Sequence, residues 1–455
     1  MSSQPSDSES SSASASGPDF HSPEQPPKRA LLASVQLPDT DERAFQESLD
    51  ELGRLAETLG LSVEGRITQR RPRLDPSAYL GPGKVEELAT LVKASDERTV
   101  VLLDHEVSPS QARNLQKAVG AFSVLDRTAL ILEIFHRHAR SRQAKVQVEM
   151  VRLQYMAPRL RENQKLGDRV RGGIGGKGAG ESQMELDRRK LRDRVAELRD
   201  ELEALTTEHK TRSARRQGLR RVALCGYTNA GKSTMFRALT ESDVYIADKL
   251  FATLDTTVRA LHPSPRQRIL LSDTIGFIRN LPTQLVASFK STLDEALEAS
   301  LILHVVDASD PACLRHIETT RGVLSEIGAG DVPQLFVFNK SDQLEGGQLP
   351  VDLQAFVDAL PPIASSSGSA PRPAVLASAK NPADVARVRQ AIIDFFDRDL
   401  IQTEIFVPYN RQSLRGAIYD SADVLGERFD ETGTYFSVRI EQVALARLTA
   451  SLNLA

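Results

Sequence analysis

Cysteine and tryptophan are scarce in this chain of 455 residues, which has two cysteines, Cys225 and Cys313, and no tryptophan. Two cysteines cannot build a disulfide framework, and no group of Cys and His has the spacing of a zinc site. No apolar run approaches the about 20 residues that span a bilayer, and no lipidation motif or amphipathic anchor is present. The first residues lack the basic and apolar regions of a secretory signal. These absences predict a soluble, cytoplasmic protein without a membrane anchor, and we expect a monomer.

Charge of neither sign dominates the chain, but it is unevenly placed. The sequence holds 58 Lys and Arg against 61 Asp and Glu, a formal charge of −3. Residues 136–220 alone hold 22 basic against 12 acidic residues. A basic segment on a mildly acidic protein favours a polyanionic partner for that segment. The simpler alternative is a solvated helical surface with mixed ion pairs.

Composition and hydrophobic periodicity divide the chain into five parts. A Ser-rich tail has too little apolar surface to fold, and strands then alternate with amphipathic helices, which predicts a parallel α/β sheet. Two long helices with a 3-4 apolar rhythm predict an antiparallel hairpin, and a further α/β domain is followed by a small α/β appendage. The predicted bounds are 1–29 for the tail, 30–139 for the N-terminal α/β domain, 140–217 for the hairpin, 218–399 for the third domain and 400–455 for the appendage. Within the appendage we expect a helix near 411–425.

Seven glycines fall between residues 167 and 182, where the two long helices should meet. A plain helix–helix connector needs only about 2–8 residues. Arg169, Arg171 and Lys177 are interleaved with the glycines, a composition that suits close backbone approach to phosphates. We therefore predict that these three side chains contact nucleic acid, and a flexible loop is the alternative.

A phosphate-binding loop is the strongest motif in the sequence. Residues 226–234 read GYTNAGKST, which is G-x-x-x-x-G-K-[ST] placed between a buried strand and a helix. Gly226 and Gly231 allow backbone N–H groups to point inward and cradle phosphates. Lys232 supplies a point charge to the β and γ phosphates, and the Ser233 hydroxyl is a candidate Mg²⁺ ligand.

Four downstream elements follow in the order that this loop requires. Asp273 ends a strand and is suited to hold Mg²⁺ through water, and the Gly276 N–H can sense the γ-phosphate. Thr253 is the candidate switch threonine that completes the Mg²⁺ shell. The Asp342 carboxylate can accept both hydrogens that guanine N1 and its exocyclic amine offer, whereas adenine offers no such pair. With residues 378–380 against the base, these elements predict a GTP site.

The motifs GYTNAGKS, FATLD, DTIGF, NKSD and SAK together resemble a translation-factor-type GTPase, so the third domain is expected to be a P-loop GTPase domain. Four upstream stretches narrow the resemblance to the HflX family of ribosome-associated GTPases, and they lie at 79–88, 103–116, 124–155 and 172–194. The resemblance covers roughly residues 31–455. It implies GTP hydrolysis with Mg²⁺, binding to the large ribosomal subunit and its ribosomal RNA, and splitting or rescue of ribosomes.

The resemblance also assigns roles to individual residues. Catalytic roles are implied for Lys232, Thr253 and Gly276, and Mg²⁺ ligation for Ser233, Thr253 and, through water, Asp273. The implied nucleotide-binding residues are Gly226, Tyr227, Thr228, Asn229, Ala230, Gly231, Lys232, Ser233, Thr234, Phe251, Ala252, Thr253, Leu254, Asp255, Asp273, Thr274, Ile275, Gly276, Asn339, Lys340, Ser341, Asp342, Ser378, Ala379 and Lys380. One departure is Thr256, which stands where the family often has proline.

Several positions leave alternatives open. Phe277 stands where Ras-like enzymes place a Gln that orients the attacking water, so we expect slow intrinsic hydrolysis that the ribosome stimulates. Asn229 is compatible with K⁺ as a second cofactor or with simple loop capping. Asp104 to Glu106, at the end of a strand, are interpreted as a structural turn.

Two other functions compete with a ribosome-splitting switch. One is an assembly factor or RNA remodeller that acts through its N-terminal half and itself binds nucleotide, which residues 79–84 (YLGPGK) weakly suggest. This stretch is too short for a phosphate loop and lacks the Ser or Thr after Lys84. The other is a GTP-dependent protein adaptor.

Overall fold

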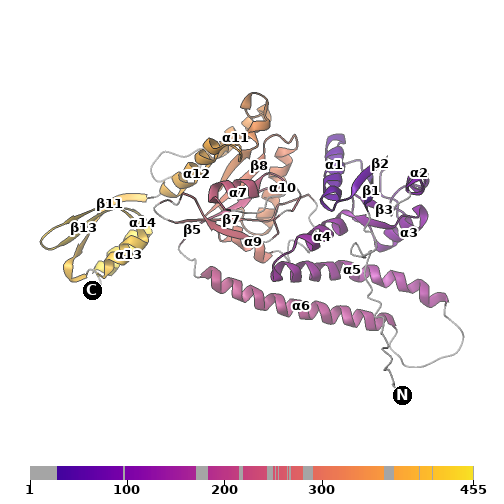
Figure 1. Cartoon of the computed structure of the whole chain (residues 1–455), viewed down its shortest axis with the longest axis horizontal. Coiled ribbons are helices and arrows are strands. Elements are labelled where there is room, and N and C mark those ends of the chain that lie inside the picture. The colour runs from indigo at the N-terminus through magenta and orange to yellow at the C-terminus, as the bar shows by residue number, and fades with distance from the viewer. Residues whose placement is uncertain are drawn as a thin grey trace, which may run out of the picture. The chain divides into compact units, whose positions relative to one another are not determined.

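The computed structural model describes residues 28–95, 98–170, 183–214, 219–242, 250–251, 253–254, 256–263, 265, 268–279, 290–362, 373–398, 400–411 and 413–453 (Figure 1). They form two compact units. The first extends to Ile134 and includes Glu149–Glu197, and the second holds Phe135–Val148 and the chain from Leu198 onward. The predicted tail lies, up to residue 27, outside the described residues.

A parallel sheet in the strand order β2-β1-β3-β4 is the centre of the first unit. Its strands are β1 (Arg29–Gln36), β2 (Ser62–Arg70), β3 (Thr99–Leu103) and β4 (Ser123–Asp126). The helices that follow them are α1 (Glu42–Thr58), α2 (Pro82–Ala94), α3 (Pro109–Val119) and α4 (Arg127–His138). Every residue of β3 is buried, as expected of an inner strand that helices cover on both faces. The predicted parallel α/β fold is confirmed.

Helix α1 illustrates how the local sequence sets these elements. The Asp41 side chain accepts a hydrogen bond from the Ala44 N–H at 2.7 Å and so caps the first turn. Phe45, Leu49 and Leu52 recur at helical spacing and are all buried. Capping and periodicity therefore act together to begin the helix and to turn one face toward the sheet.

Buried charges meet at the carboxyl edge of this sheet. The Arg127 guanidinium donates to Asp104 Oδ1 at 3.0 Å and also pairs with Glu51, and all three residues are buried. His105 follows Asp104 in the sequence, and its Nδ1 lies 2.9 Å from the Tyr79 hydroxyl. Because each group has a partner within the fold, this turn holds the domain together, which agrees with its interpretation as structural.

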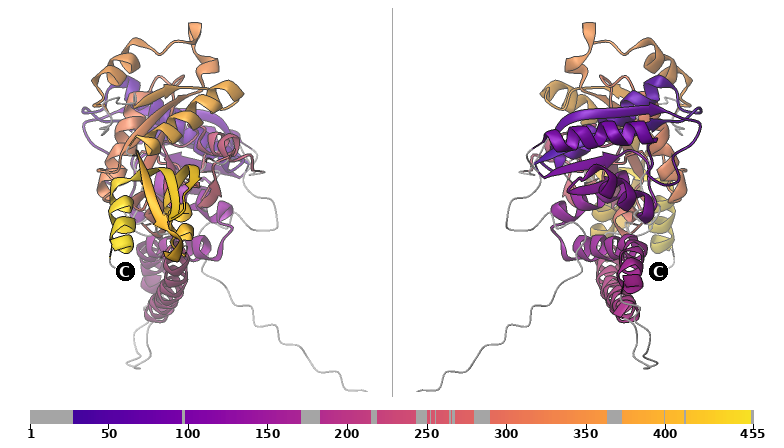
Figure 2. Two further views of the ribbon diagram at one scale, coloured as in Figure 1. Left: turned by 90° about the vertical axis from the view of Figure 1, so that its left-hand side faces the viewer. Right: turned by 90° about the vertical axis from the view of Figure 1, so that its right-hand side faces the viewer.

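Two long helices, α5 (Arg142–Val170) and α6 (Gln183–Ala214), run antiparallel (Figures 1 and 2). Arg142 pairs with Glu201, and Arg194 pairs with Glu149 at 3.1 Å. The paired residues are one heptad apart on each helix, and the pair that comes first along α5 comes second along α6. This is the register of an antiparallel hairpin. The glycine-rich segment was expected to begin at residue 167, but α5 continues to Val170, because one glycine costs a helix only about 1 kcal/mol.

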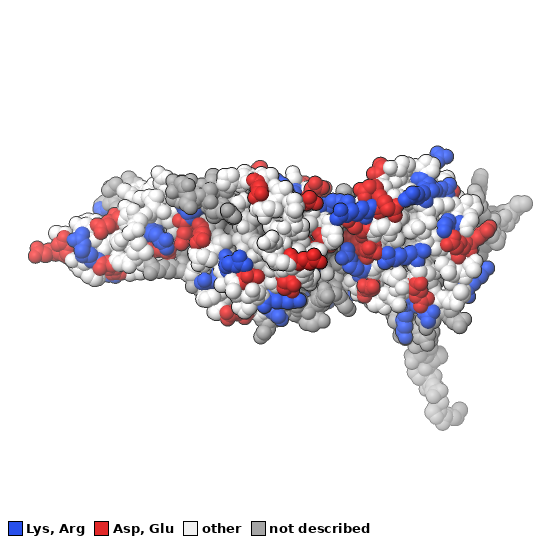
Figure 3. Space-filling view, turned by 90° about the horizontal axis from the view of Figure 1, so that it is seen from above, with Lys and Arg blue, Asp and Glu red and all other residues white. Residues whose placement is uncertain are grey.

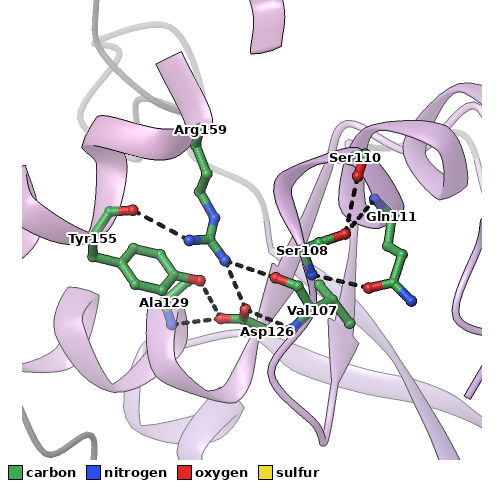
Figure 4. Close-up of polar contacts among 8 residues, drawn as sticks. All are labelled: Val107, Ser108, Ser110, Gln111, Asp126, Ala129, Tyr155 and Arg159. Atoms are coloured by element: carbon green, nitrogen blue, oxygen red, sulfur yellow. Dashed lines mark hydrogen bonds and ion pairs between the residues drawn. The ribbon is translucent and has the colours of Figure 1, made fainter. Parts of the chain in front are cut away.

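Asp126, at the end of β4, is a buried carboxylate that gathers polar groups from several elements (Figure 4). Its Oδ1 accepts from the Ala129 N–H at 2.9 Å and from the Tyr155 hydroxyl at 2.5 Å. Its Oδ2 accepts from the Val107 N–H at 3.2 Å and from the Arg159 guanidinium at 2.9 Å. Burial and the Asp126 carboxylate both raise the pKa of Tyr155, so its hydroxyl remains a donor. The network attaches α5 to the N-terminal sheet.

Replacing Asp126 with alanine is expected to lower the free energy of unfolding by about 3–5 kcal/mol, because the Arg159 charge loses its buried partner. Hydrogen exchange should accelerate at the α5 amides around Tyr155, and urea unfolding gives the stability change. Asp200→Ala, which removes an exposed carboxylate from α6, is the matched control and should change stability by less than about 0.5 kcal/mol. Unchanged exchange in α5 would show that this network does not hold the helix.

The second unit is built on a sheet in the order β10-β9-β8-β5-β7-β6, in which only β6 is antiparallel. Its strands are β5 (Arg220–Cys225), β6 (Thr257–Ala260), β7 (Ile269–Asp273), β8 (Leu301–Asp307), β9 (Gln334–Asn339) and β10 (Ala374–Leu376). Its helices are α7 (Lys232–Thr240), α9 (Lys290–Leu297), α10 (Cys313–Glu326), α11 (Val351–Ala359) and α12 (Pro382–Asp397). Short 3₁₀ turns cover Ser341–Gln343, Glu345–Gly347 and Tyr409–Arg411.

Alternate residues of β5 serve two separate layers. Val222 and Leu224 pack with the apolar faces of α7 and α12, whereas Ala223 and Cys225 pack with α9 and α10. Because both faces of the strand are covered, its residues from Val222 to Cys225 are all apolar, as the sequence indicated. The parallel direction of β5, β7, β8 and β9 places their carboxyl ends at one edge of the sheet.

The C-terminal appendage is an antiparallel sheet in the order β11-β13-β12. Its elements are β11 (Leu400–Pro408), α13 (Leu414–Ser421), β12 (Ala422–Phe429), β13 (Gly433–Glu441) and α14 (Gln442–Asn453). Ile418 of α13 and Leu448 of α14 are buried in one cluster with Val407, Phe436 and Val438 of the sheet. The helix predicted near 411–425 was wrong in its second half, because residues 422–429 pair with β13 instead. None of the helices in the described part of the chain combines the length and apolarity needed to cross a membrane.

Candidate nucleotide site

The loop between β5 and α7 has a backbone that only glycine can adopt at two positions. Gly226 has φ 150°, and a Cβ there would lie 2.1 Å from the Val305 carbonyl oxygen. Gly231 has φ 91°, and a Cβ there would lie 2.2 Å from Asn339 Nδ2. The exposed Asn229 between them has φ 61°, a left-handed conformation that Asn tolerates well. The loop is therefore wrapped tightly over the N-terminus of α7, where backbone N–H groups can receive an anion.

Lys232 is buried inside this loop. Its Nζ donates to the Tyr227 carbonyl oxygen at 2.8 Å. Burial lowers the pKa of Lys232 to about 8, while the nearby Asp273 carboxylate acts in the opposite direction. A buried ammonium gains most from a dense anionic partner, and a phosphate at the loop would supply one.

Three oxygens from three separate segments converge beside Lys232. Ser233 Oγ lies 2.7 Å from Asp273 Oδ2 and 2.8 Å from Thr253 Oγ1, and Thr253 Oγ1 lies 3.2 Å from Asp273 Oδ2. An octahedral Mg²⁺ with bonds of about 2.1 Å holds adjacent ligands about 3.0 Å apart, so the 2.8 Å between Ser233 Oγ and Thr253 Oγ1 suits two direct ligands. Asp273 is fully buried, and its Oδ1 has no hydrogen-bond partner among the described residues. Burial raises the pKa of Asp273, and a cation would favour its ionised form.

The segment after β7 is fastened to the phosphate-binding loop. The Phe277 N–H donates to the Gly226 carbonyl oxygen at 3.1 Å, and the Thr228 N–H donates to the Phe277 carbonyl oxygen at 2.7 Å. A Cβ on Gly276 would lie 2.9 Å from Lys232 Nζ, so this backbone passes directly beside the ammonium. Phe277 is buried and packs with Ala223 and its neighbours, so its ring fills the core and offers no group that orients water.

The two motifs expected at the base meet at the ends of β9 and β10. The Ser378 hydroxyl donates to Asp342 Oδ1 at 2.6 Å, and Lys380 Nζ lies 3.9 Å from Asp342 Oδ2. The side chain of Asp342 is 39% exposed, so its second oxygen is open to a ligand. Asn339 instead faces inward: it donates to the Ala230 carbonyl oxygen at 2.9 Å and accepts from the Ala379 N–H at 3.0 Å. Asn339 thus joins the phosphate-binding loop to both base motifs.

Two supporting carboxylates were missed by the sequence reasoning. Asp307, the last residue of β8, pairs with Lys340 Nζ at 2.7 Å. Asp384, in the first turn of α12, accepts from the Ser378 N–H at 2.8 Å and from the Ser341 hydroxyl at 3.4 Å. The position of Asp307 at the end of a buried strand was a usable signal, whereas Asp384 reaches its partners only through the packing of α12.

Most of the predicted site residues are described, and they lie along one edge of the sheet. Thr234 is in the first turn of α7, Phe251 and Leu254 are buried, and Ile275 is buried beside Thr274, whose hydroxyl donates to the Leu224 carbonyl oxygen at 2.7 Å. Ala252, Asp255, Arg171 and Lys177 lie outside the described residues. Arg169 is in the last turn of α5. No group of three or more His, Cys, Asp or Glu suited to a metal occurs in the described part of the chain, whereas the Ser233 site relies on two hydroxyls.

The site combines a glycine-rich loop around a buried lysine, two hydroxyls beside a buried carboxylate, and a partly exposed aspartate. They lie at the edge of a parallel sheet that helices cover on both faces, and this combination defines a P-loop GTPase. Family models agree with this class, matching as GTP-binding GTPase N-terminal over residues 46–136, GTP-binding GTPase Middle Region over 138–216 and 50S ribosome-binding GTPase over 221–340. The chain belongs to the HflX family of GTPases, and the resemblance seen in its sequence is confirmed.

Three relatives support this assignment. GTPase HflX of Gluconacetobacter diazotrophicus is 48% identical over 459 residues, covering 93% of this chain and 97% of the relative. GTPase HflX of Magnetococcus marinus is 39% identical, and the match covers 94% of this chain and 96% of the relative. GTPase HflX of Escherichia coli is 38% identical, and the match covers 88% of this chain and 92% of the relative. A crystal structure of a complex of SsGBP and GDP is 24% identical with a TM-score of 0.48, covering 81% of this chain and 98% of its own.

Proposed function

We propose that this GTPase is a switch that binds the large ribosomal subunit when loaded with GTP, splits or rescues ribosomes, and leaves after hydrolysis. The observation that carries the switch is the contact of Thr253 with both Ser233 and Asp273. A threonine placed in this way would join the segment that carries it to the metal and therefore to the γ-phosphate. The matched description, 50S ribosome-binding GTPase, supports the choice of partner.

In this proposal each part of the site has one task. The N–H groups of the loop and the Lys232 ammonium hold the β and γ phosphates. Ser233 and Thr253 would ligate Mg²⁺, with Asp273 acting through water, and the ion would supply positive charge to the phosphates. Gly276 offers its N–H to the γ-phosphate, and Asp342 selects guanine. The remaining predicted contacts enclose the nucleotide. They come from residues 227–234, 251–255, 273–276, 339–342 and 378–380.

Slow hydrolysis follows from the side chain after Gly276. Phe277 is buried and cannot orient water, and the hydrolytic rate then depends on a group or an ordering that the ribosome supplies. Asn229 is exposed in a left-handed conformation, which accounts for an asparagine there through its backbone alone. A K⁺ ion at Asn229 stays a prediction.

The proposed contact with ribosomal RNA uses Arg169, Arg171 and Lys177. It is supported by the excess of basic residues in 136–220 and by the glycines around these side chains. On the face drawn in Figure 3, basic and acidic side chains are interspersed. The proposed electrostatic attraction to RNA therefore rests on residues 136–220 and not on this face.

Co-sedimentation with purified large subunits tests the proposal. The wild-type chain should be retained with a non-hydrolysable GTP analogue and released with GDP. Changing Arg169, Arg171 and Lys177 to alanine should weaken retention at least about tenfold and reduce its salt dependence, because fewer phosphates are neutralised. The matched control changes three exposed arginines outside residues 136–220, Arg321, Arg428 and Arg447, to alanine, and this variant should still be retained by the subunit.

The other outcomes separate the competing functions. Equal retention with GDP and with the analogue would contradict the switch and favour an assembly factor or RNA remodeller that acts through the N-terminal half. Retention that does not depend on Arg169, Arg171 and Lys177 would contradict the proposed RNA contact. No retention in either state would contradict the ribosomal assignment.

A further inference from the structure

We propose that His138 and Phe135, in the last turn of α4, are positioning residues that hold the switch segment so that Thr253 reaches the metal site. This inference rests on the proposed role of Thr253 and adds to it the groups that set its position. All of these residues belong to the second compact unit. They are far apart in the sequence, and no nucleotide motif includes α4.

The contact begins at Phe251, whose backbone is unusual. Its φ of 57° lies in the left-handed region, which a residue with a bulky side chain rarely adopts without compensating contacts. Phe251 is also only 2% exposed, although it lies in no helix or strand. A strained and buried residue in a loop indicates that neighbouring groups hold it there.

Two neighbours of different chemistry supply that hold. His138 Nδ1 lies 2.9 Å from the Phe251 carbonyl oxygen, and because a carbonyl can only accept, Nδ1 is the donor. The ring of Phe135 meets the ring of Phe251 edge to face, with centroids 4.5 Å apart and planes at 76°. The hydrogen bond from His138 holds the Phe251 backbone, and the ring of Phe135 holds the Phe251 side chain. A displacement of Phe251 would therefore weaken both contacts.

This hold acts directly on the metal site because the chain between them is short. Thr253 follows Phe251 by two residues, which span at most about 7 Å. Thr253 Oγ1 lies 2.8 Å from Ser233 Oγ and 3.2 Å from Asp273 Oδ2. Fixing Phe251 therefore confines Thr253 to the region in which it can complete the metal shell.

Measured affinities for two nucleotides separate this role from simple packing. In the proposed switch, Thr253 would ligate the metal only when the γ-phosphate is bound, so a looser switch segment should weaken binding of GTP but not of GDP. His138→Ala should weaken binding of the magnesium complex of a non-hydrolysable GTP analogue about threefold to tenfold, the effect of one lost hydrogen bond. Its affinity for GDP should stay within about twofold of wild type.

Two further variants sharpen the result. His138→Asn places an amide N–H near the position of Nδ1 and should restore most of the affinity for the analogue. Lys145→Ala, an exposed change on α5, should leave both affinities unchanged. Equal losses for the analogue and GDP, or no loss for either, would overturn the positioning role.

Thr253→Ala distinguishes this inference from the function on which it rests. If Thr253→Ala lowers affinity for the analogue selectively while His138→Ala does not, the role of His138 is wrong and that of Thr253 stands. If Thr253→Ala leaves the ratio of the two affinities unchanged, the proposed switch role of Thr253 fails, and the positioning role fails with it.

Discussion

Replacing Lys232 with alanine is expected to weaken the binding of both GTP and GDP by about a hundredfold. A hydrogen bond to a charged group contributes about 1.5–3 kcal/mol, which corresponds to roughly tenfold to 150-fold in affinity. Lys232 is buried within the loop, and its Nζ donates to the Tyr227 carbonyl oxygen of the same loop. We therefore expect no other side chain to supply this positive charge in the variant. Equilibrium titration with a fluorescent nucleotide measures the change.

The control for this substitution is Lys145→Ala, which removes the same side chain from an exposed position on α5. Circular dichroism should show that both variants are folded, since among the described residues the Lys232 ammonium donates a single hydrogen bond, to the Tyr227 carbonyl oxygen. A folded Lys232→Ala variant that binds GTP with nearly wild-type affinity would show that the loop amides alone hold the phosphates.

The second large effect is expected at the base. Asp342→Asn should lower the affinity for GTP at least about a hundredfold and raise that for xanthosine triphosphate, so that the preference reverses. The Ser378 hydroxyl can still donate to the amide oxygen at 342, which leaves the amide N–H₂ in place of the open carboxylate oxygen. An N–H₂ repels the guanine amine but can donate to the carbonyl group that xanthine carries at the same carbon.

Competition between the two nucleotides for the purified variant measures this reversal directly. Asp352→Asn, at an exposed position in the first turn of α11, is the control and should keep the wild-type preference. Loss of GTP binding without any gain for the xanthine nucleotide would mean that Asp342 supports the loop and does not read the base.

Much of the fold could be predicted because its signals are local. The strand–helix alternation of the first unit and the two long helices were predicted from apolar periodicity, and the structure has them. The helix near 411–425 was partly wrong because β12 depends on pairing with β13, a contact that periodicity does not encode. The domain boundaries stay predictions.

The candidate site divides in the same way. Gly226, Gly231 and Lys232 are recognisable from the sequence, since adjacent residues build the loop. Asn339 was predicted as part of a base motif, and the structure adds that its side chain joins Ala230 to Ala379. Asp384 was missed altogether, since its hydrogen bonds to the base motif depend on where α12 packs.

The sequence by itself determined the class of the protein, its family and the order of its nucleotide motifs, because each motif is a short run whose backbone and chemistry are set by adjacent residues. Only the tertiary structure decided which distant groups meet. The contacts of Asp126 with Arg159 and of Phe251 with Phe135 and His138 join segments far apart in the chain. Such pairs form when helices and strands pack, and the identity of either partner alone does not specify the other.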